Sequence, residues 1–230
     1  MKADLDRYLQ ENKAAALWVT GPAQHNPAMV YLTGGGHLTQ ANVIKITGKA
    51  PLLCHAPMER DEAAHTGLKT LNVNQYPLVE RLKLAEGDHL LANALLYKEI
   101  FEEIGLTAGK VLIYGRTDAG KHFSILSKLS ELMPDLQFAG DIDDAVLLQA
   151  MATKEKGEIE RIRKMGGVVV DVVSRVADFL TNHAVVDEVL IKPDGNPLLI
   201  GDVKAKINMW LAEQGAENPE NTIFAIGRDA

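Results

Sequence analysis

The sequence contains a single cysteine, Cys54, and no long run of apolar residues. One cysteine excludes an internal disulfide bond and removes any thiolate metal cluster. Because no run of about 18 apolar residues occurs, we expect no membrane-spanning segment. The N-terminal stretch MKADLDRYLQENK is charged and lacks the apolar centre of a signal peptide. We therefore expect a soluble, cytoplasmic protein.

Positive charge is scarce as well. The 230 residues include 24 lysines and arginines against 31 aspartates and glutamates, which gives a net charge of −7, and no basic block stands out. This balance argues against nucleic acid and anionic membrane as partners. Hydrophobic residues at 47% and charged residues at 24% are typical of a globular protein. The length predicts one or two domains.

Several common catalytic signatures are absent from the sequence. No serine lies in a G-x-S-x-G context, and the histidines show neither H-x-x-x-H nor H-E-x-x-H spacing. We interpret the histidines as solvated or hydrogen-bonded surface side chains. Cys54 lies in an apolar run typical of a strand, which predicts a buried thiol rather than a nucleophile. The seven histidines are His25, His37, His55, His65, His89, His122 and His183.

Residues 115–122, GRTDAGKH, have the G-x-x-x-x-G-K spacing of a phosphate-binding loop. They follow a predicted strand and precede a predicted helix, as such loops do. The residue after Lys121 is His122, whereas these loops carry a serine or threonine hydroxyl there for magnesium. We therefore favour a strand-to-helix turn, with nucleotide binding as the alternative.

Two further segments each allow two interpretations. The glycines at 34–36 either reverse the chain or cradle a phosphate, and we favour the reversal. Asp141, Asp143 and Asp144 either bind a cation or form a solvated linker that supplies helix N-caps, and we favour the linker.

Strand and helix patterns alternate over the first half of the chain and predict an α/β domain with a central mixed sheet. The predicted strands cover residues 14–20, 29–33, 42–47, 52–55, a short stretch at 71–73, and 110–114. The predicted helices cover residues 4–11, 57–64, a long stretch that ends at Gly105, and 123–132.

A long amphipathic helix is predicted from Thr153 to Leu180, where apolar residues recur at steps of three and four. Thr153 is its predicted N-cap. Gly166 and Gly167 inside it each cost about 1 kcal/mol relative to alanine. A close contact with another helix or strand would make that cost tolerable.

The remaining residues predict a hairpin, a helix and a strand. Residues 189–192 and 198–200 flank the turn sequence Pro-Asp-Gly-Asn-Pro. Asp202 is the predicted cap of a helix that ends at Gly215. Residues 222–226 predict a strand, one loop before the last residue. We expect this second domain to be incomplete and to expose apolar surface.

Three stretches, in this order, resemble the creatinase/prolidase/aminopeptidase P family of "pita-bread" metallopeptidases. Residues 26–34, NPAMVYLTG, are similar to the N-x-x-YLTG segment of the family's N-terminal domain. Thr153-Lys154 and residues 158–163, EIERIR, are similar to the K-x-x-x-E-I-x-x-I-R entry into its catalytic domain. Residues 222–230, TIFAIGRDA, are similar to the segment before its Pro-His turn. The chain departs from the pattern at Met151, near where many members carry an arginine.

The resemblance implies a creatinase-like N-terminal α/β domain over residues 1–143 and the first part of a pita-bread α+β domain over residues 152–230. It also implies a homodimer that hydrolyses the bond preceding proline. The family uses two divalent metal ions (Mn, Co or Zn), held by two aspartates, one histidine and two glutamates. All five ligands would lie beyond Ala230, so we assign no catalytic, cofactor-binding or metal-ligating residue to this chain.

We therefore expect an inactive fragment of a Xaa-Pro aminopeptidase or dipeptidase, an enzyme that acts on proline-containing peptides. No cofactor is expected on the fragment itself. Glu155, Glu158 and Glu160 are interpreted as the solvated face of the long helix rather than as metal ligands. The alternative is a non-catalytic dimerisation or interaction module of the same fold.

Overall fold

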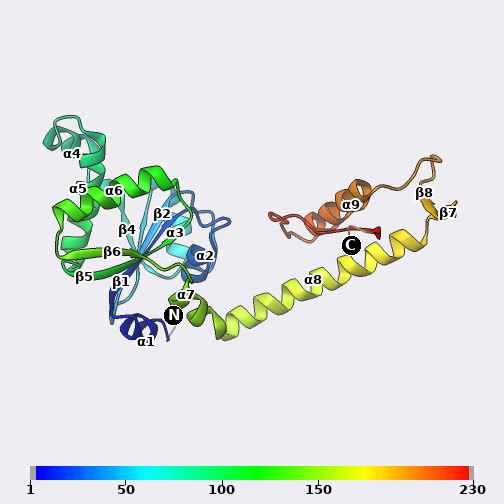
Figure 1. Cartoon of the computed structure of the whole chain (residues 1–230), viewed down its shortest axis with the longest axis horizontal. Coiled ribbons are helices and arrows are strands. Elements are labelled where there is room, and N and C mark those ends of the chain that lie inside the picture. Colours follow the sequence, from blue (N-terminus) through cyan, green and yellow to red (C-terminus); the bar gives the residue numbers. More distant parts are fainter. Residues whose placement is uncertain (1–3, 228–230) are drawn as a thin grey trace. The chain divides into compact units, whose positions relative to one another are not determined.

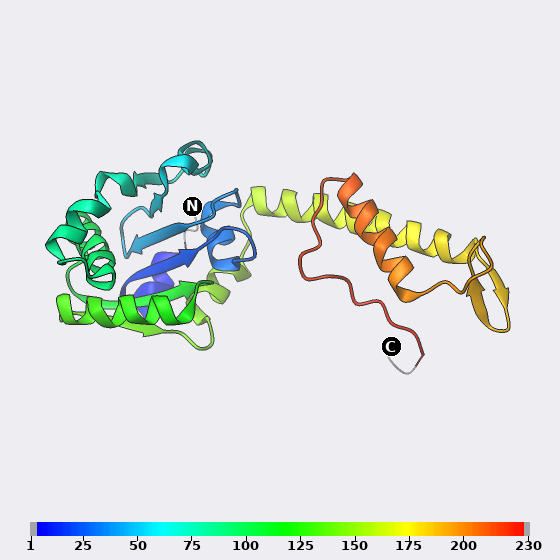
Figure 2. The same cartoon turned by 90° about the horizontal axis from the view of Figure 1, so that it is seen from above.

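The computed structural model describes residues 4–227. The chain divides between Thr153 and Lys154 into two structural units. The first unit contains a sheet with helices on both faces, and the second contains two helices and a two-stranded hairpin (Figure 1, Figure 2).

A six-stranded sheet organises the first unit (Figure 1). Its strands are β1 (Ala14–Gly21), β2 (Ala41–Ile46), β3 (Leu52–His55), β4 (Lys69–Asn72), β5 (Gly109–Gly115) and β6 (Leu136–Gly140). They lie in the order β4-β3-β2-β1-β5-β6. β2 is antiparallel to both β1 and β3, whereas β1 and β5, β5 and β6, and β3 and β4 pair in parallel. The predicted class, an α/β fold with a central mixed sheet, is confirmed.

Side-chain alternation along β1 builds two apolar layers, one on each face of this sheet. Leu17 and Val19 are buried in the first layer, and Ala16 and Trp18 in the second, because successive strand residues point to opposite faces. The first layer also contains residues of α1 (Leu5–Glu11), α2 (Pro27–Thr33), α3 (Arg60–His65) and α7 (Ala145–Ala152). The second contains residues of α5 (His89–Ile104) and α6 (Ala119–Leu132), and α4 (Leu78–Leu84) packs on α5.

The segment at 29–33 is part of helix α2, so its prediction as a strand was wrong. The Oδ1 atom of Asn26 accepts a hydrogen bond from the backbone N–H of Met29 at 3.3 Å and caps the helix. Pro27 supplies a backbone angle suited to the first helical turn. Gly34 ends the helix with a left-handed backbone, φ 80°. These end signals outweigh the strand propensity of the residues between them.

Most other predicted elements of the first unit are confirmed, with shifted boundaries. The helix predicted at 57–64 is a 3₁₀ turn (Pro57–Glu59) followed by α3. The helix predicted from residue 123 begins at Ala119, because Asp118 caps it. The glycines at 34–36 all have positive φ and lead from α2 to β2, as the predicted reversal requires. Four elements were not predicted from the sequence: α4, β6, α7 and a 3₁₀ turn at Val73–Gln75.

The long amphipathic helix of the second unit is α8 (Lys156–Thr181). Its N-cap residue is Glu155, so the prediction of Thr153 as N-cap was wrong. The Glu155 backbone N–H donates a hydrogen bond to the Glu158 Oε2 atom at 2.9 Å. This is the contact of a capping box, in which the third helical residue reaches back to the cap. The helix therefore begins where an acidic residue can accept that bond.

The hairpin of the second unit joins β7 (Ala184–Val186) to β8 (Val189–Ile191). The predicted hairpin turn at 193–197 is confirmed, because Ile191 and Pro197 form an isolated antiparallel bridge and the Leu198 N–H donates to the Leu190 carbonyl oxygen at 2.7 Å. The strand expected at 198–200 does not form. Residue 200 already belongs to α9 (Ile200–Glu213). Asp202 lies inside the first turn of α9, where its carboxylate accepts from the Leu199 N–H at 2.9 Å.

Residues 222–226 form no strand, because no described segment pairs with them. The prediction of a strand there was wrong. The last three residues of the TIFAIGRDA stretch, 228–230, lie outside the described residues.

A small apolar core joins α8 to α9 within the second unit. Val172, Val203 and Ile207 are buried in it, and the rings of Phe179 and Trp210 pack edge to face with their centroids 5.9 Å apart. Five further apolar side chains on one face of α8 have exposed fractions from 43% to 62%. We call these residues the α8 apolar face: Ile159, Ile162, Met165, Val169 and Val173.

Gly166 and Gly167 of α8 face open space. A Cβ atom added at either position would meet no neighbouring atom of the described residues within 4 Å. The close contact that would explain two glycines in this helix is therefore not made by the described part of the chain.

Candidate functional site

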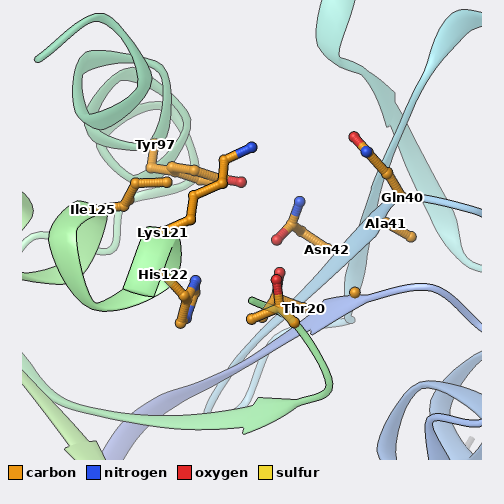
Figure 3. A pocket seen from close by; sticks show the side chains of 10 residues that line it. Thr20, Gln40, Ala41, Asn42, Tyr97, Lys121, His122 and Ile125 are labelled. Carbon is orange, nitrogen blue, oxygen red and sulfur yellow. The ribbon is translucent and has the colours of Figure 1, made fainter. Parts of the chain in front are cut away.

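One pocket of the first unit is lined by polar side chains at an edge of the sheet (Figure 3). The carboxyl ends of β1 and β5 and the amino end of β2 meet at this edge, since Thr20 is paired with both Asn42 and Gly115. The cavity has a volume of about 130 Å³. Its lining residues are Thr20, Gly21, Gln40, Ala41, Asn42, Tyr97, Thr117, Lys121, His122 and Ile125.

Trp18 supports three of the pocket's side chains from beneath. Its indole Nε1 donates a hydrogen bond to the Asn42 Oδ1 atom at 2.9 Å, which fixes the orientation of that amide. The His122 ring packs edge-on against the indole with centroids 5.2 Å apart, and the Tyr97 ring lies at 4.6 Å. Trp18 is fully buried in the close-packed second apolar layer. Its contacts therefore hold the side chains of Asn42, His122 and Tyr97 in fixed positions.

Burial determines the protonation states in the pocket. It lowers the pKa of His122, so the imidazole is neutral at pH 7. It raises the pKa of Tyr97 to about 12, more than the hydrogen bond from Asn42 lowers it, so the phenol keeps its proton. None of the lining residues is an aspartate or glutamate. The pocket therefore has a positive ammonium group, from Lys121, and no lining carboxylate.

The GRTDAGKH segment is the strand-to-helix turn that the sequence analysis favoured. The Asp118 Oδ1 atom accepts a hydrogen bond from the backbone N–H of Lys121 at 2.7 Å and caps α6. A phosphate-binding loop would present this helix terminus to a phosphate, but here the protein's own carboxylate lies there. Gly115 serves close backbone approach instead: its φ is 116°, and an added Cβ would lie 2.0 Å from the Thr20 carbonyl oxygen.

The histidines and the cysteine form no metal site in the described chain, because residues 4–227 contain no group of three or more histidine, cysteine, aspartate or glutamate side chains that could hold an ion. His55 is buried with its Nδ1 atom 2.7 Å from the Ala56 carbonyl oxygen, so the interpretation of it as a surface side chain was wrong. Cys54 is buried as predicted, and burial raises the pKa of its thiol to about 12. A protonated thiol of this kind is a poor nucleophile.

The acidic residues before α7 hold this helix in place. The Asp141 Oδ2 atom accepts hydrogen bonds from the Tyr114 hydroxyl at 2.8 Å and from the Val146 N–H at 3.4 Å. Asp141 thus ties the end of β5 to the first turn of α7, although it does not stand at the N-cap position of that helix. Asp143 is exposed, and Asp144 precedes the helix with a left-handed backbone, φ 47°, and no side-chain cap bond.

No protein-family model matches the sequence, and no curated protein matches it significantly. Solved structures do match the fold. A dipeptidase from Pyrococcus horikoshii superposes with a TM-score of 0.59 at 14% identity, over 93% of this chain and 50% of that one. An X-Pro aminopeptidase from Thermotoga maritima gives 0.56 at 15% identity, over 94% and 50%. A prolidase from Thermococcus sibiricus gives 0.55 at 13% identity, over 94% and 49%.

This is the creatinase/prolidase fold. The resemblance that the three sequence stretches indicated is confirmed at the level of the fold. The chain spans about half the length of these solved structures. Among the described residues, no helix has both the length and the apolar character needed to cross a membrane.

In this chain, the NPAMVYLTG stretch of the creatinase/prolidase fold has a packing role. The Asn26 side chain donates to the Thr20 carbonyl oxygen at 3.0 Å as well as capping α2. The Tyr31 hydroxyl donates to the Ala150 carbonyl oxygen at 2.9 Å. The stretch therefore joins the end of β1, α2 and α7.

Trp18, Asn42 and Tyr97 were not predicted from the sequence as site residues. Alternation along residues 14–20 places Trp18 on the opposite face from Leu17 and Val19, so one signal was present. No local sequence pattern predicts that Asn42, a strand residue, lies beside Tyr97 in the middle of α5. That contact depends on how α5 packs on the sheet.

Proposed function

We propose that this chain is part of a Xaa-Pro peptidase of the creatinase/prolidase family, acting as an aminopeptidase or a dipeptidase. The observation that carries the proposal is the similarity of fold over more than nine tenths of the chain to a dipeptidase, an X-Pro aminopeptidase and a prolidase. The three ordered sequence stretches support it from a separate direction, since they were identified from residues alone.

In this proposal, residues 1–143 form the creatinase-like N-terminal domain and residues 152–230 form the first part of the pita-bread catalytic domain. The α8 apolar face supports this division. Five apolar side chains on one helix face, each at least 43% exposed, are typical of a surface that another element covers. We propose that the remainder of the catalytic domain is that element, because the similar structures are about twice as long as this chain.

The metal centre belongs to the same proposal. The described residues do not provide a donor set that fits two divalent ions, so the ligands of the two ions are proposed to lie outside this chain. The substrate is a proline-containing peptide, and the assembly is a homodimer in the cytoplasm. On its own, the present chain is proposed to be inactive.

The second candidate is a non-catalytic interaction module of the same fold. The same α8 apolar face favours it, since a partner protein or a second copy would cover these side chains equally well. The two candidates require different codons after that of Ala230 in the natural gene.

Those codons test the proposal. We expect them to encode a Pro-His turn and then two aspartates, a histidine and two glutamates with the order of the family's ligand set. A stop codon directly after residue 230, or a continuation without these residues, contradicts the peptidase and favours the interaction module.

A further inference from the structure

We propose that the pocket formed by Thr20, Asn42, Tyr97, Lys121 and His122 binds a small oxyanion, a phosphate or carboxylate group carried by a soluble metabolite. This inference concerns the first unit alone and does not depend on the proposed peptidase activity. Figure 3 shows these side chains gathered around one space, on strands β1 and β2 and helices α5 and α6.

The place of the pocket in the sheet is the first argument. β1 and β5 are parallel neighbours. The chain leaves β1 for α2, which packs in the first apolar layer, and leaves β5 for α6, which packs in the second. Two adjacent parallel strands whose following helices lie on opposite faces form a topological switch point. The crevice outside the carboxyl ends of such strands is where open α/β sheets bind ligands.

The chemistry of the lining is the second argument. Lys121 supplies an ammonium group that forms no ion pair with any described residue. The protonated Tyr97 hydroxyl and the Thr20 hydroxyl are further hydrogen-bond donors. Asp118, the carboxylate next to Lys121 along the chain, is bound to the backbone as the cap of α6 and is not among the lining residues. A site with one cation, several neutral donors and no lining carboxylate favours an anion.

One buried polar atom of a lining residue lacks a hydrogen-bond partner within the described part of the chain. The Nε2 atom of His122 is buried and has no hydrogen-bond partner among the described residues. Buried polar groups in folded proteins nearly always have a partner. Because burial lowers the pKa of His122, the ring is neutral and would pair with a polar ligand atom without repelling Lys121. A ligand atom that reached this nitrogen from the pocket would complete its hydrogen bonding.

The fluorescence of Trp18 reports whether an anion binds in the pocket. The chain contains two tryptophans, so the variant Trp210→Phe leaves Trp18, which contacts His122 and Tyr97, as the only one. Its fluorescence is followed while sodium phosphate or sodium acetate replaces sodium chloride at constant ionic strength. We expect a saturable change with at least one of the two anions. Saturation with phosphate assigns a phosphate-bearing ligand, and saturation with acetate assigns a carboxylate.

Matched lysine variants test the assignment of the pocket. In the Trp210→Phe background, Lys121→Met removes the ammonium group and is expected to weaken binding about tenfold or more, the usual effect of losing a charged hydrogen bond. Lys121→Gln is a second variant, which removes the same charge but keeps a polar side chain. Lys128→Met removes the same charge from the same helix, where Lys128 is paired with Glu131 outside the pocket, and is expected to leave binding unchanged. The proposal is overturned if neither anion gives a saturable change, or if the Lys121 and Lys128 variants weaken binding equally.

Discussion

The Tyr31 hydroxyl donates a hydrogen bond to the carbonyl oxygen of Ala150, 2.9 Å away and 119 positions later in the chain. The bond joins α2 to α7 inside the first apolar layer. Tyr31 belongs to the NPAMVYLTG stretch, and Ala150 lies a few residues before the end of the first unit. A residue of the family-like stretch thus ties α2 to the last helix of the first unit.

The substitution Tyr31→Phe is expected to lower the free energy of unfolding by about 1 kcal/mol, because it leaves the buried Ala150 carbonyl without this donor. Urea denaturation followed by circular dichroism measures the change. Tyr8→Phe is the control, since the Tyr8 hydroxyl accepts only an exposed bond from Arg7, and it should change stability by less than about 0.5 kcal/mol. Equal effects of the two substitutions would show that the Tyr31 bond does not stabilise the unit.

Asn26→Ala is expected to cost about 2 kcal/mol. Its side chain both caps α2 and donates to the Thr20 carbonyl oxygen, and it is 1% exposed. The same urea experiment applies. Asn74→Ala is the matched control because the Asn74 side chain is exposed. A cost for Asn26→Ala as small as that of the control would contradict the cap as the cause of the helix at 27–33.

Acid is expected to destabilise the first unit through Asp6. Lys45 is 2% exposed and pairs with Asp6. Burial raises the pKa of Asp6. The hydrogen bonds from Lys45 and Gly48 together lower that pKa by more than burial raises it, so the net pKa lies below its ordinary value. A carboxyl group with a lowered folded-state pKa stabilises above its unfolded pKa of about 3.9 and loses that contribution as the pH falls through the folded value. Stability in urea should therefore fall below about pH 4.

Asp6→Asn should remove part of that acid dependence. At pH 7 it should also cost about 1–3 kcal/mol, because it leaves the Lys45 ammonium buried without its anion. This cost is at the lower end of buried pairs, since Asp6 itself is 41% exposed. Asp61→Asn, at an exposed carboxylate paired with Arg60, should change neither quantity. An unchanged pH profile in Asp6→Asn would refute the role of this pair.

Gly166→Ala and Gly167→Ala are each expected to stabilise the 230-residue chain by up to about 1 kcal/mol. Both lie inside α8, and an added Cβ meets no described atom within 4 Å, so alanine contributes only its higher helix propensity. Gly195→Ala is the contrasting control, because the φ of Gly195 is 83° and alanine is strained there. Differential scanning calorimetry compares the three. Destabilisation by either α8 substitution would reveal a contact on this side of the helix.

The sequence predicted what local signals determine. The strand at 14–20, the hairpin of β2 and β3 and the end of α5 at Gly105 all follow from apolar patterns bounded by turn residues, and the structure confirms them. The strand prediction at 29–33 was wrong because the capping residues Asn26 and Gly34, and not the residues between them, determine that this segment is a helix. The strand expected at 222–226 failed because a strand needs a partner, which no described segment provides.

The candidate pocket could not be predicted from sequence patterns for a related reason. Lys121 and His122 were noticed only as part of a phosphate-loop spacing, and the structure gives that spacing another role. Their actual neighbours, Asn42 and Tyr97, reach them through the packing of α5 and α6 on the sheet. Hydrophobic periodicity and motif spacing are local patterns, and they do not predict a contact between segments that are distant in the sequence.

The most direct test of the central proposal is hydrolysis of an Xaa-Pro dipeptide and of an Xaa-Pro-Yaa tripeptide by the product of the complete natural gene, measured beside the 230-residue chain with and without Mn²⁺. The proposal predicts that the complete product cleaves the bond preceding proline in at least one of these peptides, that a chelator abolishes this cleavage, and that the 230-residue chain cleaves neither. A complete product that folds, binds Mn²⁺ and leaves Xaa-Pro peptides intact would contradict it.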